Sequence, residues 1–508
     1  MIQTLHHPQD IVNWLRARMA GAGTLQTDSR QVRPGDAFIA WPGAATDGRR
    51  HVADARVRGA VACLVEAEGL DAFGLDGDDL CAIPGLKAAT GLIAALWFDQ
   101  PSQQLDVLAV TGTNGKTSTT WWLAHALNLL LKNERVPRVE CGLVGTLGIG
   151  VLSALEDTGL TTPDPVRLQR CFRQLRDQGL GACAIEASSI GLAEHRLAGT
   201  RIRTAVFTNF TQDHLDYHAS MGAYWQAKRA LFDWPGLQAA VVNVDDPAGA
   251  ELHAELQGRG LDLWSVSAQG PARLMAQDIR WTDQGLGCTV VEGDERLPLA
   301  TTLVGDFNLL NLLGVIATLR TLGISLTQAM AACAQLAPMP GRMECLATPG
   351  QPLVVVDYAH TPDALDKALR ALRPLAQARG GELGCVFGCG GDRDAGKRPL
   401  MGAAVERLAD RVIVTDDNPR SEDPAQILHQ ILQGTIAGET VRVEPDRAAA
   451  IALAVADADP ADVLLIAGKG HEPYQEIAGV RRPFSDQACA QQVLQARATA
   501  QPSSASAP

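Results

Sequence analysis

The chain has 508 residues, so at roughly 150 residues per domain we expect about three domains, which excludes a single small binding module. Hydrophobic residues make up 46% and charged residues 20% of the chain, values typical of folded protein and far from those of disordered chains. Lys and Arg number 44 against 57 Asp and Glu, a net charge of −13 that repels the phosphate backbone of nucleic acid. We therefore expect no nucleic-acid partner.

The N-terminal sequence and the cysteines indicate the cellular compartment of the protein. The N-terminal MIQTLHHPQD has neither the basic nor the apolar region of a signal peptide, and no run approaches the ~18 apolar residues needed to span a bilayer. The 11 cysteines form no CxxC pair, which predicts free thiols in a reducing compartment. We expect a cytoplasmic protein without a membrane partner, and a disordered tail over residues 498–508, which are small and polar.

Short β-branched runs that lead into Ala- and Leu-rich helical stretches recur along the chain, which is typical of βαβ units in parallel sheets. A helical run over 86–98 precedes the break at Pro101–Leu105, and another, ending near Leu336, precedes the break at Pro338–Gly341. These breaks predict an α/β fold with domains over 1–100, 101–337 and 338–497. The predicted strands are Asp106–Gly112, Cys183–Ala187, Thr204–Asn209, Leu353–Tyr358, Gly384–Gly388, Arg411–Asp416 and Val463–Gly468. Polar residues follow these strands, at the strand ends where such sheets bind ligands.

The strongest local motif is Thr111–Ser118 (TGTNGKTS), between an apolar strand and a helix-compatible run. Glycines let backbone N–H groups approach phosphate oxygens, Lys116 can reach the terminal phosphates and the Thr117 hydroxyl can bind Mg²⁺. Val110 occupies the position of the first glycine in the generic P-loop, so an ordinary strand-to-helix turn stays an alternative. The candidate phosphate-binding residues are Gly112, Thr113, Asn114, Gly115, Lys116, Thr117 and Ser118.

Nine blocks in order along the chain resemble the Mur ligase family of ATP-dependent amide ligases. They are Thr111–Ser118, Glu186–Leu192, Thr208–His218, Gly305–Asn311, Pro340–Glu344, Asp357–Leu365, Gly388–Pro399, Asp416–Arg420 and Gly468–Glu472. The resemblance covers nearly the whole chain. It implies a central P-loop ATPase domain with a parallel sheet, flanked by an N-terminal UDP-binding α/β domain and a C-terminal Rossmann-like domain that binds the incoming amino acid.

The resemblance also implies a reaction. ATP would phosphorylate a substrate carboxylate, and an amine would then attack the acyl phosphate; bringing two anions together requires metal ions and cationic groups. The implied catalytic residues are Lys116, Glu186, His214 and Lys228, and the implied Mg²⁺ ligands are Thr117, Glu186, His214 and Lys228 after its carbamylation by CO₂. Further implied ATP contacts are Asn308, Asn311, Arg342, Asp357 and His360.

Two substrate sites follow from the same resemblance. Contacts to UDP-N-acetylmuramoyl-L-alanyl-D-glutamate are expected from Thr27, Ser29, Ala44, Ala45, Thr46, Thr161, Thr162, Ser188, Glu194 and Arg196. Contacts to meso-2,6-diaminopimelate are expected from Arg393, Asp417, Asn418, Pro419, Arg420, Gly468 and Glu472, whose charges suit its distal carboxylate and ammonium. The chain departs from relatives at Ala44–Thr46, at Ile190 (often His) and at Glu194 (often Gln). We expect a monomer with small-molecule partners that acts in peptidoglycan precursor synthesis.

Four alternatives stay open at this stage. A relative that adds lysine is disfavoured by the run Asp417–Arg420 (DNPR), and a folylpolyglutamate-type ligase by the N-terminal segment. A nucleotide-dependent scaffold protein would retain the P-loop but not turnover. His214 and His218, four residues apart, are compatible with a zinc site, but no third ligand stands at a known spacing.

Overall fold

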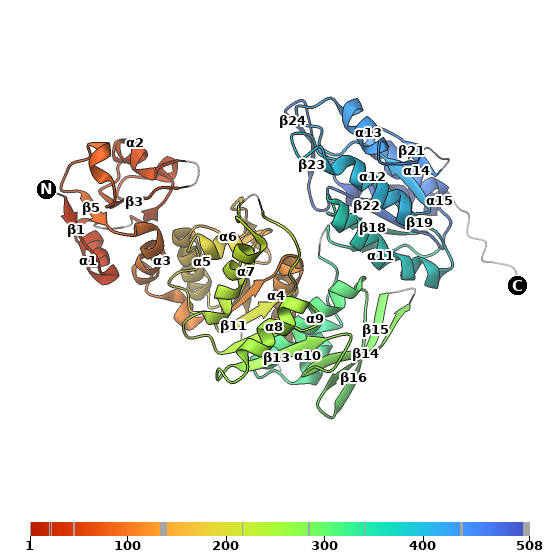
Figure 1. Cartoon of the computed structure of the whole chain (residues 1–508), viewed down its shortest axis with the longest axis horizontal. Helices are drawn as coiled ribbons and strands as arrows, with labels where there is room; N and C mark the ends of the chain where they lie inside the picture. Colours follow the sequence, from red (N-terminus) through yellow and green to blue (C-terminus); the bar gives the residue numbers. More distant parts are fainter. Residues whose placement is uncertain are drawn as a thin grey trace, which may run out of the picture. The chain divides into compact units, whose positions relative to one another are not determined.

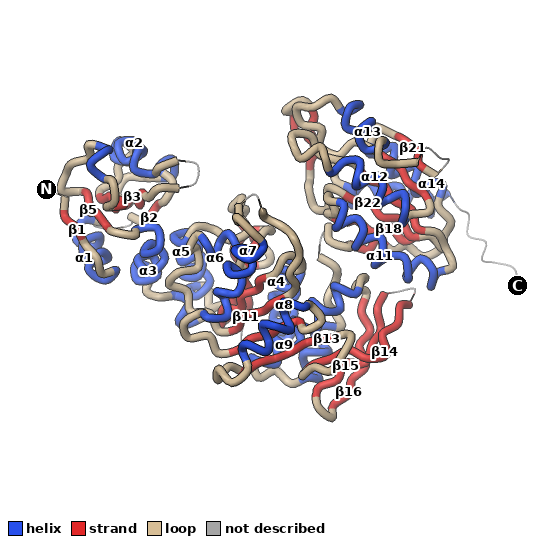
Figure 2. Tube along the Cα trace, viewed as in Figure 1, coloured by secondary structure: helices blue, strands red, loops and turns tan. Residues whose placement is uncertain are grey.

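The computed structural model describes residues 2–19, 21, 23–43, 46–132, 140–215, 217–282, 285–339, 341–436 and 440–500. Contacts divide the chain into two compact units. The first unit holds Met1–Met275 and Leu310–Cys333, and the second holds Ala276–Leu309 and Ala334–Pro508. Figure 1 follows the chain through both units, and Figure 2 shows that helices and strands alternate through most of each. No helix among the described residues is long and apolar enough to cross a membrane.

The first unit opens with a five-stranded parallel sheet of strand order β1-β5-β4-β3-β2. Its core includes Ile11 and Leu15 of α1, Leu64 of β4 and Ile93 of α3. The elements are β1 (Gln3–Thr4), α1 (Pro8–Arg18), β2 (Leu25–Gln26), η1 (Ser29–Gln31), β3 (Ala37–Ala40), η2 (Gly48–His51), α2 (Val52–Val57), β4 (Ala62–Glu66), η3 (Leu70–Phe73), β5 (Leu80–Ile83) and α3 (Leu86–Trp97).

The central sheet brings three strand ends together. Strand β6 (Asp106–Thr111) pairs in parallel with β10 (Ala182–Glu186) on one side and β11 (Thr204–Phe207) on the other. Val110 is in register with both Glu186 and Val206, so the residues that follow β6 lie beside Glu186 and Thr208. All three strands are almost entirely buried, as expected for parallel strands covered by helices on both faces.

Helices and strands continue to alternate in the rest of the region around the central sheet. They are η4 (Pro101–Gln104), α4 (Lys116–Lys132), β7 (Cys141–Gly145), β8 (Gly148–Val151), β9 (Ala154–Glu156), α5 (Pro165–Asp177), α6 (Ser189–Ala193), α7 (Met221–Arg229), η5 (Ala230–Asp233), β12 (Ala239–Asn243), α8 (Pro247–Leu256), β13 (Asp262–Ser267), β14 (Leu274–Thr282), α9 (Asp306–Thr321) and α10 (Leu326–Cys333). Strand β14 and helix α9 each cross from one unit into the other along the chain.

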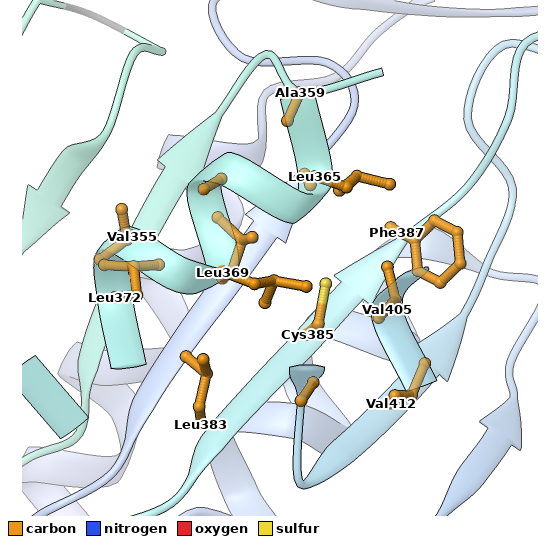
Figure 3. Close-up of a cluster of buried hydrophobic side chains, with 14 of the residues drawn as sticks. Val355, Ala359, Leu365, Leu369, Leu372, Leu383, Cys385, Phe387, Val405 and Val412 are labelled. Carbon is orange, nitrogen blue, oxygen red and sulfur yellow. The ribbon is translucent and has the colours of Figure 1, made fainter. Parts of the chain in front are cut away.

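The second unit contains a six-stranded sheet of order β17-β18-β22-β19-β20-β21, parallel except for β17. Figure 3 shows part of its core, in which Leu365, Leu369 and Leu372 of α11 lie over the sheet near Cys385. The elements are β15 (Gly285–Glu292), β16 (Glu295–Thr301), β17 (Glu344–Leu346), β18 (Leu353–Asp357), α11 (Pro362–Arg379), β19 (Leu383–Phe387), α12 (Lys397–Leu408), β20 (Arg411–Val414), α13 (Pro424–Leu432), β21 (Val441–Val443), α14 (Arg447–Asp457), β22 (Val463–Ala467), β23 (Tyr474–Ile477), β24 (Val480–Pro483) and α15 (Asp486–Ala500).

The seven predicted strands are all present, as β6, β10, β11, β18, β19, β20 and β22. Each ends one or two residues before the predicted end, because the terminal residue, which is Gly, Asp, Tyr or Asn in every case but Ala187, already belongs to the following loop. The expected disordered tail begins too early: α15 continues to Ala500, and the rest of that segment lies outside the described residues. Alanine-rich sequence favours continuation of a helix, which composition alone did not reveal.

Candidate active site

The loop Thr111–Ser118, here called the phosphate loop, turns directly from β6 into α4. Gly112 and Gly115 have backbone φ angles of 146° and 84°, which residues with a side chain rarely adopt. A Cβ on Gly112 would lie 1.9 Å from Thr208 Oγ1, and one on Gly115 would lie 2.4 Å from Asn311 Oδ1. Glycine is therefore required at both positions. Lys116 Nζ folds back onto the loop and donates to the carbonyl oxygens of Gly112 at 2.9 Å and Thr113 at 2.8 Å.

The residues that follow β11 form hydrogen bonds with the phosphate loop. Asn209 Oδ1 accepts a 2.9 Å hydrogen bond from the Asn114 amide, and Thr208 Oγ1 donates to the Asn114 carbonyl at 2.6 Å. The Thr113 amide donates to the Asn209 carbonyl at 2.8 Å. The loop is thus held in shape by protein hydrogen bonds, and α4 begins at its end, where the positive end of a helix dipole favours a bound anion.

Glu186 lies at the end of β10 with 1% of its surface exposed. Its carboxylate accepts hydrogen bonds from Thr117 Oγ1 at 2.9 Å and from the Thr146 amide at 2.8 Å. Burial raises the pKa of Glu186, while the nearby Lys116 charge and these hydrogen bonds oppose the rise. A carboxylate beside a threonine hydroxyl is an oxygen donor set of the kind that Mg²⁺ binds, so these residues fit the metal that the family resemblance implies.

Lys228 of α7 is equally buried, at 1% exposed, and donates a 2.6 Å hydrogen bond to the Gly112 carbonyl. Its Nζ also lies 4.4 Å from the centre of the Tyr224 ring. Burial, reinforced by the like charge of Lys116, lowers the pKa of Lys228 to about 6. A neutral amine is the form that can react with CO₂, so the environment of this lysine fits the expected carbamate.

His214 is placed differently from Glu186 and Lys228. Its Nε2 lies 3.6 Å from Asp213 Oδ2, its φ is 52°, and its ring centre is 6.0 Å from that of Tyr224. No hydrogen bond among the described residues joins it to Glu186. His218 is buried instead and its Nε2 lies 3.0 Å from Ser189 Oγ. Within the described residues no group of three or more His, Cys, Asp or Glu side chains is arranged to hold a metal.

The residues expected to contact the dipeptide end of the sugar nucleotide cluster around Thr162. Thr162 is buried and its Oγ1 lies 2.9 Å from Ser188 Oγ, while Arg196 Nη1 donates to the Thr162 carbonyl at 2.8 Å. Ser188 also caps α6. Thr161 Oγ1 lies 3.1 Å from Thr146 Oγ1, which links this cluster to the Glu186 carboxylate.

Glu194 already has protein partners. Its carboxylate forms a 2.6 Å ion pair with Lys87 of α3 and accepts a short hydrogen bond from the Tyr217 hydroxyl. These contacts tie the five-stranded region to the central sheet within the first unit. Ser29 is buried, Thr27 is half-buried and Thr46 is exposed, whereas Ala44 and Ala45 lie outside the described residues.

The expected ATP contacts divide between the two units. Asn311 faces Gly115 in the first unit, whereas Asn308 in the second donates to the Val304 carbonyl at 2.7 Å. Also in the second unit, the Arg342 guanidinium stacks 4.7 Å from the Tyr358 ring centre, and His360 Nδ1 lies 2.7 Å from the Tyr358 carbonyl oxygen. Asp357 accepts from the Met343 and Ala359 amides, and burial raises its pKa against the opposing charge of Arg342.

The second unit brings the expected diaminopimelate residues together at the carboxyl ends of β19, β20 and β22. A Cβ on Gly468, whose φ is 117°, would lie 2.3 Å from Asp417 Oδ2. Asn418 Nδ2 donates to Glu472 Oε2 at 2.7 Å.

Two arginines complete this group. Arg420 Nη1 donates to the Gly391 carbonyl at 2.6 Å and would lie 2.9 Å from a Cβ on Gly390. Arg393 is exposed, and its Cγ would lie 3.9 Å from the same Cβ. Pro419 is buried, and its carbonyl group lies against Gly391.

Several residues of this site were not predicted from the sequence. They are Thr146, Thr208, Asn209, Tyr224, Lys469 and Arg447. The first three follow the ends of β7 and β11, so their polar side chains after buried strands were a usable signal. Lys469 also lies just after a buried strand, β22, so the same signal applied to it. Tyr224 and Arg447 sit in the helices α7 and α14, whose local sequence carries no such signal.

Comparison with known proteins shows which family this chain belongs to. The family model for the Mur ligase middle domain matches residues 110–319, that for the Mur ligase glutamate ligase domain matches 341–470, and that for the Mur ligase family catalytic domain matches 23–75. The UDP-N-acetylmuramoyl-L-alanyl-D-glutamate–2,6-diaminopimelate ligase of Acidovorax sp. (strain JS42) is 67% identical over 496 residues, 98% of this chain and 99% of that protein. The chain belongs to the Mur ligase family.

Further Mur ligases give the same result. The enzyme of the same name from Pseudomonas aeruginosa is 49% identical and covers 93% of this chain and 95% of its own. A solved structure of a UDP-N-acetylmuramoyl-L-alanyl-D-glutamate–2,6-diaminopimelate ligase matches with a TM-score of 0.71 and 34% identity over 94% of this chain and 95% of its own. The MurF ligase of Thermotoga maritima in complex with ADP, at 18% identity and a TM-score of 0.61, shares the fold. As a Mur ligase, this chain is an ATP-dependent amide ligase.

Proposed function

We propose that this chain joins meso-2,6-diaminopimelate to the D-glutamyl γ-carboxylate of UDP-N-acetylmuramoyl-L-alanyl-D-glutamate, in peptidoglycan precursor synthesis. The observation that carries the proposal is 67% identity, over nearly the full length of both chains, to a ligase named for these substrates. The grouping of Asp417, Asn418, Arg420, Gly468 and Glu472 supports the same amino acid.

The first step transfers the γ-phosphoryl group of ATP to the substrate carboxylate. The phosphate loop and Lys116 would hold the β- and γ-phosphates, and Asn308, Asn311, Arg342, Asp357 and His360 would hold the rest of the nucleotide. Glu186, Thr117, His214 and carbamylated Lys228 would bind Mg²⁺, which neutralises charge that develops on the transferring phosphoryl group. Lys116 would offset the negative charge that builds up as the two anions approach.

The second step is attack of the diaminopimelate amine on the acyl phosphate, which forms the amide bond and releases inorganic phosphate. A fixed carboxylate can orient an ammonium group, and a fixed guanidinium can pair with the distal carboxylate. Glu472 and Asp417 supply the first kind of group, and Arg420 and Arg393 supply the second. Asn418, Pro419 and Gly468 would shape the pocket around them.

The UDP and dipeptide parts of the other substrate would be held by the N-terminal and central regions. The residues proposed for this task are Thr27, Ser29, Ala44, Ala45, Thr46, Thr161, Thr162, Ser188, Glu194 and Arg196. We propose domain boundaries at 1–100, 101–337 and 338–497, a monomeric state, and a cytoplasmic location, where these substrates are made.

The test is phosphate release from Mg²⁺-ATP in the presence of UDP-N-acetylmuramoyl-L-alanyl-D-glutamate, with meso-diaminopimelate, L-lysine or no amino acid. We expect release with diaminopimelate alone. Release with lysine at equal efficiency would retain the ligase but contradict the amino-acid assignment. No release under any condition would contradict the proposed function and favour a scaffold protein.

A further inference from the structure

Lys469 is a fully buried lysine beside the proposed amino-acid pocket, and the mechanism above does not use it. It lies two residues after the end of β22 and has 0% of its surface exposed. Its Nζ donates to Asn418 Oδ1 at 3.0 Å and to Glu472 Oε2 at 3.2 Å, and lies 5.7 Å from the Tyr474 ring centre. A buried ammonium is costly unless it is paired, so its position between these two side chains calls for a reason.

The contacts of Lys469 fix the orientation of the Asn418 amide. Asn418 Oδ1 accepts from Lys469 Nζ and, at 2.9 Å, from the Glu476 amide. Asn418 Nδ2 donates to Glu472 Oε2 at 2.7 Å. With two donors on the oxygen, a flip of the amide would place its NH₂ group against a cation and an N–H group. Asn418 therefore presents its NH₂ side toward Glu472 and the pocket.

The same lysine fixes Glu472. Both Lys469 Nζ and Asn418 Nδ2 bind the Oε2 atom, and no described residue donates to Oε1. The Glu472 side chain is 18% exposed, so Oε1 is the oxygen left for a ligand. The buried Asp417 carboxylate, which follows β20, lies beside Gly468, the residue before Lys469.

We propose that Lys469 is a positioning residue for the incoming amino acid. It clamps Glu472 Oε2 and the Asn418 amide oxygen, so that Glu472 Oε1 and the Asn418 NH₂ group are presented to an ammonium and a carboxylate of the substrate. Lys469 itself does not contact the reacting atoms. The inference rests on the proposed function, since it assigns a role in binding the diaminopimelate of that reaction.

The first test is the Lys469→Met variant, with KM measured for each of the three substrates. Loss of a hydrogen-bonded charge costs about 1.5–3 kcal/mol, so we expect the KM for diaminopimelate to rise by about 10- to 100-fold. The KM values for ATP and for the sugar nucleotide should change by less than about threefold. Lys367→Met, which removes an exposed lysine paired with Asp363 on α11 of the same unit, is the matched control and should leave all three unchanged.

A double-mutant cycle separates positioning from general packing. If Lys469 acts through Glu472, the Lys469→Met change should have little further effect in a Glu472→Gln background. If Lys469→Met does not fold, Lys469→Gln, which is neutral but can still donate a hydrogen bond, replaces it in both measurements.

The outcomes distinguish this inference from the proposed function. If wild-type protein does not use diaminopimelate, the proposed function fails and the inference fails with it. If wild-type protein uses diaminopimelate, then an unchanged KM for it, an equal rise in all three KM values, or additive effects in the cycle each overturn the positioning role alone.

Discussion

The side-chain nitrogen of Lys228 donates a 2.6 Å hydrogen bond to the carbonyl oxygen of Gly112, the first glycine of the phosphate loop. The lysine stands on α7 and the glycine follows β6, so the contact joins two elements far apart in the sequence. Because the amine is buried against the phosphate loop, any group added to its nitrogen would lie where metal-bound phosphates are expected.

The first prediction concerns carbamylation of Lys228. With a pKa near 6, the amine is mostly neutral at pH 7.5, and it becomes protonated and unable to hold a carbamate as the pH falls through 6. We expect Lys228→Ala to lower kcat by on the order of 100-fold or more. Protein equilibrated with ¹³C-bicarbonate should show a carbamate carbonyl signal by ¹³C NMR that Lys228→Ala lacks and Lys367→Ala retains. An identical signal in both variants would contradict the assignment to Lys228.

Glu186→Gln tests the proposed metal carboxylate. The glutamine oxygen can still accept from the Thr146 amide while its NH₂ group donates to the Thr117 hydroxyl oxygen, so the melting temperature should change little. An amide oxygen is a weaker ligand for Mg²⁺ than a carboxylate. We therefore expect a fall in kcat of about 100- to 1,000-fold together with a higher Mg²⁺ concentration for half-maximal activity. An unchanged Mg²⁺ titration would argue against Glu186 as a ligand.

The Arg447–Asp486 pair predicts a stability effect. Both side chains are 0% exposed, Arg447 Nε and Nη2 bind the two carboxylate oxygens at 2.7 and 2.8 Å, and Arg447 Nη2 also donates to the Ala467 carbonyl at 2.9 Å. Burial lowers the pKa of Arg447, but Asp486 raises it by more than burial lowers it, so the arginine stays charged. Breaking the pair with Arg447→Met should lower the free energy of unfolding by about 3–5 kcal/mol.

The measurement is chemical denaturation, with the exposed-pair variant Arg442→Met as control. Arg442 pairs with Asp457 on the surface and should contribute no more than about 1 kcal/mol. The double variant Arg447→Met/Asp486→Leu should lose less than the sum of its single variants, because neither partner is then left buried without its counter-charge.

Asp416 predicts a pH dependence of stability. Burial, with the nearby Asp417, Asp423 and Asp446 charges adding to it and Arg447 opposing it, raises the pKa of Asp416 to about 6. Since this pKa lies above the unfolded value, the folded state binds more protons between about pH 4 and 6, and the contribution of Asp416 to stability falls as the pH rises through this range. In Asp416→Asn this contribution should vanish. The melting temperature of the variant relative to wild type should therefore be higher at pH 7.5 than at pH 4.5; equal differences at both pH values would contradict the shifted pKa.

The parallel framework and the strand-end loops were predictable because their determinants are local. Buried parallel strands are continuous apolar runs, and Gly112 and Gly115 are needed where the chain turns tightly against Thr208 and Asn311. The burial of Lys228 was not predictable from QAKRALF, because a helical lysine looks the same whether it faces water or the phosphate loop. Only the family resemblance singled it out.

Side-chain contacts between segments far apart in the sequence could not be predicted from local sequence patterns. Arg447 meets Asp486 across 39 residues, and Lys469 meets Asn418 across 51, so no spacing rule connects them. Glu194 was expected to contact substrate, and its pairing with Lys87 depends on how α3 packs against the central region. Such contacts arise from tertiary packing, which sequence periodicity does not encode.

All eleven cysteines are free, and nine of them are buried. Burial raises the pKa of Cys345 to about 12 and that of Cys489 above its usual range, although both side chains are partly accessible. Little thiolate is therefore present at neutral pH, and maleimide or iodoacetamide reagents should label the native protein slowly. A single cysteine introduced on the surface would react selectively without removal of the natural thiols. Fluorescent or spin labels can thus be placed on either unit of an otherwise unaltered enzyme, to follow its motion during turnover.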